Sequence, residues 1–194
     1  MAKKVRVKSK PKKAKMKMKV KVKAKKTKSA ASMSKPGVPA GFSTVTPHLV
    51  VRDAAQAIEF YKKAFGAKET LRMPGPGGKI LHAEIKIGDS HLFLADEMPE
   101  WGSKSPLMLG GTGTTISLYV EDADAVFNRA VAAGAQVKMP LADQFWGDRY
   151  GKLGDPYGHE WAVATHLEDL SPAEMKKRQE VAMAQMAQGP PTNM

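Results

Sequence analysis

Two titratable side chains, close enough in sequence to act together in acid–base chemistry or in binding, lie on one short apolar segment. In the run LHAEIKI, His82 and Glu84 are two residues apart, so on a strand they project from the same face. We predict that Asp148 and Tyr150 lie opposite them, on an equivalent strand later in the chain. A histidine beside a glutamate can act as general acid and base, bind a cation, or join His48 in a metal site. The alternative is that both side chains face solvent on a half-exposed strand.

Three large aromatic residues in the second half of the chain, Trp146, Tyr150 and Trp161, are candidates for contact with an organic ligand. Ligand sites are commonly lined by aromatic side chains with a few polar groups among them. We therefore predict one ligand-binding cluster, made of His48, His82, Glu84, Trp146, Asp148, Tyr150 and Trp161. For each aromatic side chain, packing in the core is the alternative.

Several common catalytic signatures are absent from the sequence. There is no cysteine, which excludes a thiol nucleophile, a thiolate zinc site and disulfides. The glycine-rich runs PGPGGK and LGGTGTT lack the spacing of a phosphate-binding loop and are expected to be turns. No serine lies in a nucleophile-elbow pentapeptide. These patterns leave the catalytic residues, if there are any, unassigned.

The elements that must position these residues occur twice. The run LVVRDAAQAIEFYKKAFGAKETLRMP matches LYVEDADAVFNRAVAAGAQVKMP, with Leu, Val, Asp, Ala, Gly-Ala and Met-Pro in register. Each copy reads as a strand, a helix followed by Gly, and three more strands. We predict two βαβββ units, at 45–96 and 114–165, whose sheets bury one face against each other. A capping box at Ser171 opens a further helix that ends before Gly189.

The N-terminal segment carries most of the charge. Residues 1–28 contain fifteen Lys and Arg and no acid, which leaves 16 bases against 19 acids in the rest of the chain. So many like charges oppose folding, and we predict a disordered tail and linker at 1–41, a folded domain at 42–166, and a C-terminal helix and tail at 167–194. The tail is expected to bind DNA or another polyanion. An anionic membrane surface and a solvated appendage without a partner are the alternatives.

The sequence contains no candidate membrane span. No run supplies eighteen consecutive apolar residues, and the basic N-terminus lacks the apolar core of a secretory signal. A cytoplasmic location is therefore expected.

The phrases HLVVRDAAQAIEFYKKAFGA and GDPYGHEWAVATH resemble the vicinal oxygen chelate superfamily of glyoxalase, bleomycin-resistance and dioxygenase proteins, and in particular its PhnB-like bacterial members. The resemblance covers about 43–166 and implies an α+β fold in which two βαβββ modules form paired curved mixed sheets. It also implies a cup between sheets that holds either a divalent metal or an organic ligand. Members of the superfamily close this cup within one chain or across a dimer.

The resemblance places metal ligands on the first and last strand of each module. By the repeat, these positions are expected at His48, Leu94, Ser117 and Ala162. Leu94 and Ala162 cannot bind a metal and serine is a weak ligand. No cofactor is therefore expected, although a divalent metal stays possible.

Three functions follow from these observations. The leading prediction is a homodimer that binds a small organic ligand in a metal-poor cup, with the basic tail contacting nucleic acid. The first rival is a divalent-metal lyase or dioxygenase that uses His48 with Glu84 or His82. The second rival is a nucleic-acid-associated protein with a vestigial cup.

Overall fold

The computed structural model describes Met1 and residues 37–187, so the predicted polyanion-binding tail lies, apart from Met1, outside the described residues. Module one begins with a short strand and a helix. Asp53 caps this helix by accepting a hydrogen bond from the backbone N–H of Gln56 at 3.0 Å, and Gly66 ends it in the left-handed conformation. The elements are β1 (His48–Val51), α1 (Ala54–Phe65), β2 (Lys68–Pro74), β3 (Ile80–Ile87) and β4 (Ser90–Asp96).

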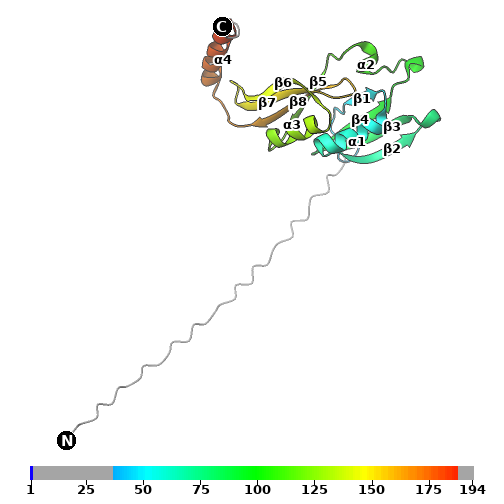
Figure 1. The fold of residues 1–194 in the computed structure, drawn as a ribbon, viewed down its shortest axis with the longest axis horizontal. Helices are drawn as coiled ribbons and strands as arrows, with labels where there is room; N and C mark the ends of the chain where they lie inside the picture. The colour runs from blue at the N-terminus through cyan, green and yellow to red at the C-terminus, as the bar shows by residue number, and fades with distance from the viewer. Residues whose placement is uncertain (2–36, 188–194) are drawn as a thin grey trace. The chain divides into compact units, whose positions relative to one another are not determined.

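Module two repeats this order. Asp122 caps its helix through the N–H of Ala125 at 2.9 Å. The elements are β5 (Thr115–Tyr119), α3 (Ala123–Ala132), β6 (Gln136–Asp143), β7 (Asp148–Gly154) and β8 (Glu160–His166). Both βαβββ units predicted from the repeat are therefore present (Figure 1).

Each module forms its own four-stranded mixed sheet. The strand order is β1-β4-β3-β2 in sheet one and β5-β8-β7-β6 in sheet two. The first and last strands of each module pair in parallel, and the other pairs are antiparallel. This topology confirms the predicted α+β fold.

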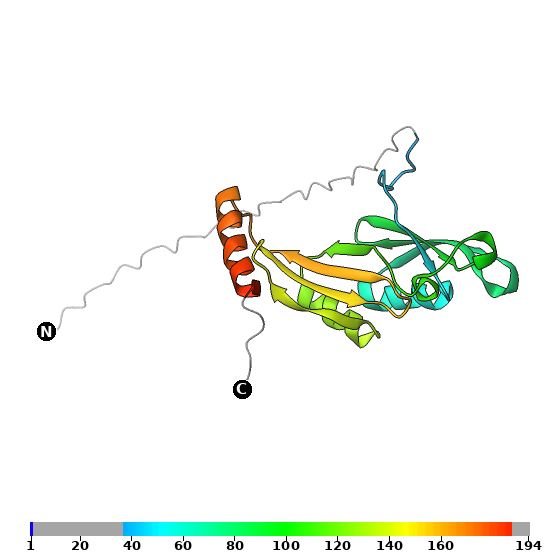
Figure 2. The ribbon, with the colours of Figure 1, turned by 90° about the horizontal axis from the view of Figure 1, so that it is seen from above.

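The two modules meet through their helices. Helices α1 and α3 contact each other and lie on the same side of the two sheets (Figure 2). Each sheet consequently has a helix side and an open face. The prediction that the two sheets bury one face against each other within the chain was wrong, because the helices, and not the open faces, provide the contact between modules.

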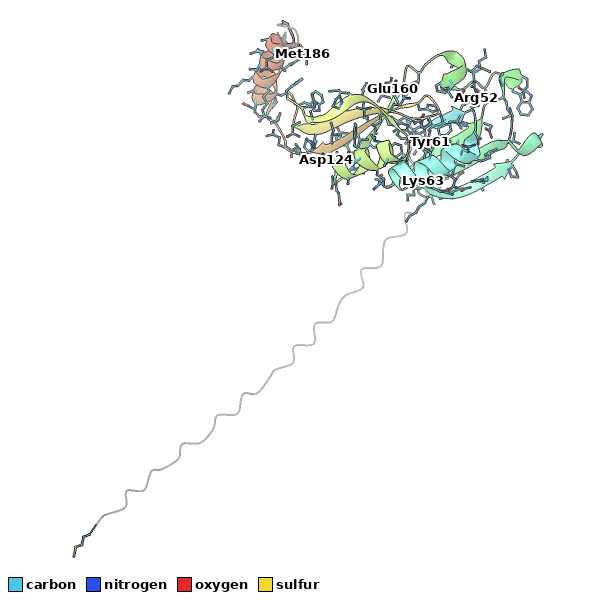
Figure 3. All side chains as sticks on the ribbon, in the orientation of Figure 1. Arg52, Tyr61, Lys63, Asp124, Glu160 and Met186 are labelled. Carbon is cyan, nitrogen blue, oxygen red and sulfur yellow. The ribbon has the colours of Figure 1, made fainter. Side chains whose placement is uncertain are left out.

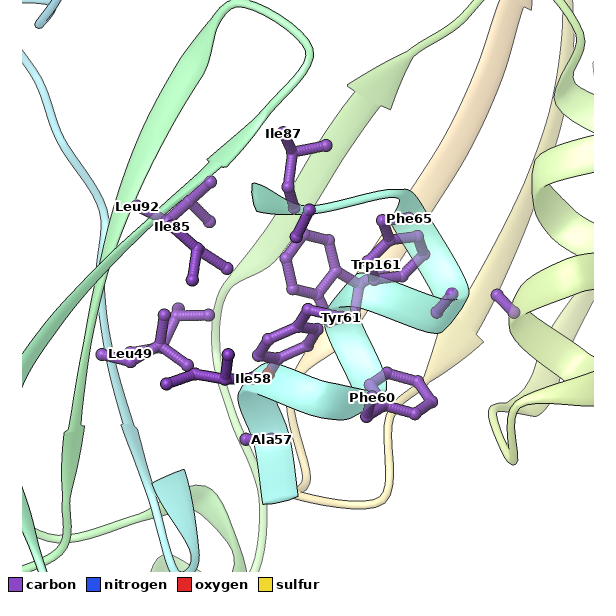
Figure 4. Close-up of a cluster of buried hydrophobic side chains, with 14 of the residues drawn as sticks. Leu49, Ala57, Ile58, Phe60, Tyr61, Phe65, Ile85, Ile87, Leu92 and Trp161 are labelled. Carbon is purple, nitrogen blue, oxygen red and sulfur yellow. The ribbon is translucent and has the colours of Figure 1, made fainter. Parts of the chain in front are cut away.

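The hydrophobic core lies on the helix side (Figure 4). From α1, the fully buried Ile58 and Tyr61 reach both modules, with Leu49 and Ile85 of sheet one and Trp161 of sheet two in the same cluster. Burying a side chain of this size stabilises a fold by about 1.5–3 kcal/mol. Helix α1 therefore acts as the shared core element of both sheets.

Three short helices and one longer helix complete the described chain. They are η1 (Pro76–Gly78), η2 (Pro99–Trp101), α2 (Pro106–Leu109) and α4 (Pro172–Ala187). Of these, α4 corresponds to the helix predicted from the capping box. Among the residues that the structure describes, no helix is both long and apolar enough to cross a membrane.

Candidate functional site on the open sheet faces

The open face of sheet one carries a compact group of polar and aromatic side chains. Along β3, Ala83 and Ile85 face the core, so His82 and Glu84 project to the open face. Phe93 on β4 pairs with Glu84 on one side and with His48 of β1 on the other. The ring centres of His82 and Phe93 are 4.8 Å apart, and those of His48 and Phe93 are 6.1 Å apart. The predicted grouping of the two histidines and the glutamate is therefore present, around a phenylalanine that the sequence analysis did not include.

The surroundings of His48 disfavour its charged form. Nε2 of His82 lies 3.5 Å from Oε1 of Glu84, too far for a strong hydrogen bond. Partial burial, and then the neighbouring His82 ring, lower the pKa of His48. A neutral imidazole, a carboxylate and an aromatic ring thus lie on one accessible surface. They can stack on a planar molecule and attract a positive charge.

The open face of sheet two holds a second group, centred on Asp148. Its carboxylate accepts hydrogen bonds from the Tyr119 hydroxyl at 2.9 Å, the Trp146 indole N–H at 3.1 Å and the His166 ring at 2.8 Å. Burial raises the pKa of Asp148, but the three hydrogen bonds outweigh it and lower the pKa overall. The Trp146 and Tyr150 rings meet edge to face at 5.5 Å. Asp148 therefore fixes the aromatic side chains at this end of the sheet.

The strand register corrects the predicted correspondence between the two faces. Glu84 pairs with Phe93 in module one, and Lys152 pairs with Ala162 in module two. Lys152 is thus the structural equivalent of Glu84, and Tyr150 is the equivalent of His82. Asp148 lies nearer the end of its strand. The predicted partners of His82 and Glu84, Asp148 and Tyr150, lie 66 residues further along the chain, whereas the register gives an offset of 68, so Lys152 was missed by two residues.

The structure excludes Trp161 from either open face. Trp161 is fully buried on the helix side, where its ring centre lies 4.6 Å from that of Phe65 and 5.3 Å from that of Tyr61 (Figure 4). Its indole N–H donates to Asp155 at 2.9 Å. The prediction of one cluster within the chain was therefore wrong in two respects. Trp161 belongs to the core, and the other six residues form two groups on two sheets.

The Asp-Pro-Tyr-Gly-His turn before β8 joins the modules. One carboxylate oxygen of Asp155 accepts from the backbone N–H groups of Tyr157 and His159, both at 2.9 Å. The other accepts from the Tyr61 hydroxyl of module one at 2.7 Å and from Trp161. His159 reaches the carbonyl oxygen of Val50 at 3.1 Å. This turn therefore fixes the position of sheet two against α1 and sheet one.

Comparison with known proteins identifies the family. The model of the Glyoxalase/Bleomycin resistance protein/Dioxygenase superfamily matches residues 41–163. The chain belongs to this superfamily. It is 49% identical over 135 residues to an uncharacterized protein of Mycobacterium bovis. The matched residues make up 68% of this chain and 89% of that protein.

Solved structures of superfamily type share the fold. TioX from Micromonospora sp. ML1 is 30% identical, with a TM-score of 0.52 over 64% of this chain and 99% of that chain. A protein from Pseudomonas aeruginosa is 27% identical, with a TM-score of 0.54 over 64% of this chain and 98% of that chain. The narrower assignment to PhnB-like proteins stays a prediction.

The superfamily's metal positions do not fit a metal in this chain. The register places His48 beside Phe93 and Ser117 beside Ala162, so the counterpart of Ala162 is Phe93. The prediction of Leu94 was wrong, because Leu94 is fully buried on the helix side. The set offers one imidazole and one hydroxyl, whereas a divalent ion needs three or more such ligands.

In the part of the chain that the structure describes, no three His, Asp or Glu side chains are placed to hold one ion. The donors therefore give no support to the metal-dependent lyase or dioxygenase.

We expect protein purified without chelator to contain well below one equivalent of zinc, iron, nickel or manganese. The physical reason is the shortage of donors around His48. Elemental analysis by mass spectrometry provides the measurement, with His48→Ala as the matched variant. Near one equivalent of metal in the wild type, absent from the variant, would contradict the prediction.

Proposed function

We propose that this superfamily member binds a small planar organic ligand, without metal, in a cup formed between the open faces of two copies of the chain. The observation that carries the proposal is the group of His48, His82, Glu84 and Phe93 on an accessible face, in which the centres of the three rings lie 4.8 to 6.2 Å apart. Aromatic surface with few polar groups is typical of ligand sites. A cytoplasmic location stays a prediction.

Two copies are needed because the described part of the chain does not enclose either open face, although Phe42 packs on His91 and Phe93 of sheet one. Sheet one presents a carboxylate at Glu84 and a large ring at Phe93, while the equivalent positions of sheet two hold Lys152 and Ala162. Pairing like faces would bring acid against acid and ring against ring. Pairing sheet one with sheet two of a second copy sets opposite charges and complementary sizes against each other. This complementarity favours a twofold homodimer with two equivalent cups.

The chemistry of the face selects the ligand. The side chains of His82 and Glu84 are 27% and 21% exposed, so they are accessible but partly shielded from water. A carboxylate in this environment attracts a cation more strongly than one in bulk solvent. The adjacent rings favour a flat molecule. We infer a planar ligand with a positive charge or hydrogen-bond donors directed at Glu84.

We expect N-methylquinolinium, a planar cation, to quench tryptophan fluorescence and raise the melting temperature of the full chain as binding increases. Glu84→Gln keeps the side-chain volume and removes the charge, so the cation should bind about tenfold more weakly. Fluorescence titration and thermal shift give the measurement. Naphthalene, the uncharged analogue, should bind wild type and variant alike.

The control variant is Glu59→Gln, which removes a carboxylate from the solvent-exposed side of α1. It should leave binding of the cation unchanged. Sedimentation velocity on the same samples reports whether the binding species is a dimer. Equal affinity of wild type and Glu84→Gln for the cation would reject the proposed role of the open face.

A second function is favoured by the charge of residues 1–28. We propose that this tail contacts DNA or another polyanion, because its fifteen Lys and Arg meet no acid within the segment and can displace counterions from phosphates. Contact of this kind depends on charge and not on base sequence. If the tail binds DNA and the open faces bind nothing, the nucleic-acid-associated protein with a vestigial cup becomes the better description.

A further inference from the structure

A polar hollow lies at one end of sheet two, separate from the group around Phe93. It measures about 560 Å³ and is bounded by the end of the sheet, the Asp-Pro-Tyr-Gly-His turn, and the segment that links the modules. On β7, Gly154 in this hollow lies four residues beyond Tyr150. Strand alternation puts Gly154 on the same face as Tyr150 and Lys152, so the hollow lies on the open face of sheet two, at the end away from Asp148.

Glycines shape this hollow. Gly158 in the turn has a φ of +90°, and a Cβ there would lie 3.2 Å from the backbone nitrogen of Leu107 at the start of α2. Only glycine allows this approach without strain. The turn and α2 therefore close one side of the hollow, with the side chains of Leu107 and Pro156 as apolar lining.

A cation and a carboxylate enter the hollow from β6 and β8, the two strands that flank β7. The strand register aligns Gln136, Gly154, Glu160 and Thr115 in one row across the sheet. Gly154 leaves a gap in this row, and the stem of Lys138 crosses it, with its Cε 2.7 Å from where a Cβ of residue 154 would stand. Lys138 and Glu160 thus share the hollow, and Figure 3 labels Glu160 at the start of β8.

These opposite charges are not paired with each other. No ion pair within 4.0 Å joins Lys138 to any described acid. Among the described residues, the partners of Glu160 Oε2 are distant: the Thr115 hydroxyl at 3.4 Å and the Lys152 ammonium at 4.0 Å. Both side chains retain hydrogen-bonding capacity directed at a common space. A molecule that carries both charges would satisfy the two at once.

We propose that this hollow binds a zwitterion with an apolar side chain, of the free amino acid class. Lys138 binds the carboxylate, Glu160 binds the ammonium group, and Leu107 with Pro156 contacts the side chain. The hollow uses residues of module two and of the segment that links the modules, whereas Glu84 lies on sheet one.

Saturation-transfer NMR on the full chain tests it with three compounds of one shape. L-leucine carries both charges, isocaproate lacks the ammonium group, and isoamylamine lacks the carboxylate. L-leucine should bind at least about tenfold more tightly than either analogue, because each analogue forgoes one charge-assisted hydrogen bond. Absence of saturation transfer to L-leucine at millimolar concentration would overturn the proposal.

Variants assign the two charged groups of the ligand to their partners. Lys138→Gln should lower the affinity for L-leucine to that of the wild type for isoamylamine. Glu160→Gln should lower it to that of the wild type for isocaproate. Gly154 has a backbone conformation that alanine can adopt, and the added methyl group would displace only the flexible Lys138 stem. Gly154→Ala should therefore lower the affinity for L-leucine about as much as Lys138→Gln does. Lys63→Gln on α1 is the control and should change nothing.

Equal L-leucine affinity in wild type, Lys138→Gln and Glu160→Gln would reject the assigned partners. Melting temperatures of all variants show that the fold is retained. Glu84→Gln should leave L-leucine binding intact. A failure of the amino acid site would therefore appear in the L-leucine measurements, and a failure of the planar-ligand site in the measurements with the planar cation.

Discussion

Replacing Asp155 by alanine is expected to lower the free energy of unfolding by about 3–5 kcal/mol. Asp155 is 8% exposed, and its carboxylate accepts four hydrogen bonds, two from side chains in the core and two from the backbone of its own turn. Alanine would leave the Tyr61 hydroxyl and the Trp161 indole N–H buried without an acceptor. Each buried donor without a partner costs about 1–3 kcal/mol. Urea unfolding of the full chain, followed by circular dichroism, gives the measurement.

The two carboxylate oxygens make Asp155→Asn an informative intermediate. Oδ1 serves the turn and Oδ2 serves Tyr61 and Trp161. An amide keeps one acceptor for the turn but presents N–H groups to the core. The Tyr61 hydroxyl can rotate to accept from this amide, whereas the Trp161 N–H can only donate. We expect the loss of stability to lie between zero and that of the alanine variant.

Tyr61→Phe is the matched control, because it removes one donor and keeps the ring that packs on Trp161 and Phe65. It should destabilise the chain by only about 0.5–1.5 kcal/mol. In combination with Asp155→Ala the two effects should be less than additive, since the hydroxyl that lacked an acceptor is gone. A loss below about 1 kcal/mol for Asp155→Ala would show that the carboxylate does not hold the modules together.

The secondary structure was predictable because each signal is local. Asp53 and Gly66 delimit α1 through capping groups next to the helix itself, and alternation indicated the strands within a few residues. The packing of the modules is not local. It depends on whether apolar helix faces or open sheet faces meet. The fully buried Tyr61 on α1 shows that the helix faces meet, but the sequence near Tyr61 does not indicate which distant residues cover it.

The candidate site was predictable where alternation along one strand sufficed. His82 and Glu84 share a face because they are two residues apart, and the structure shows them together. Trp161 was misplaced because a shift of one residue in strand phase moves a side chain to the opposite face. Lys152 was missed because the predicted correspondence between β3 and β7 was two residues out of register.

Removing residues 1–28 is expected to lower affinity for duplex DNA by orders of magnitude. The segment supplies fifteen of the 31 Lys and Arg, and the remainder of the chain has three more acids than bases. If six or more of these cations contact phosphates, the affinity of the full chain should fall by about a thousandfold or more between roughly 50 and 200 mM salt. Fluorescence anisotropy with labelled duplexes of unrelated sequence gives the measurement.

Two variants of the tail separate charge from sequence. A tail with the same composition in scrambled order should bind as the natural one does, because counterion release depends on the number of cations and not on their order. Replacing half of its lysines by glutamine should reduce the slope of log affinity against log salt in proportion to the number of phosphates that are no longer neutralised. The truncated chain should unfold at the same urea concentration as the full chain, since the described core is formed by residues between 49 and 163. Equal DNA affinity with and without the tail at low salt would reject polyanion binding by this segment.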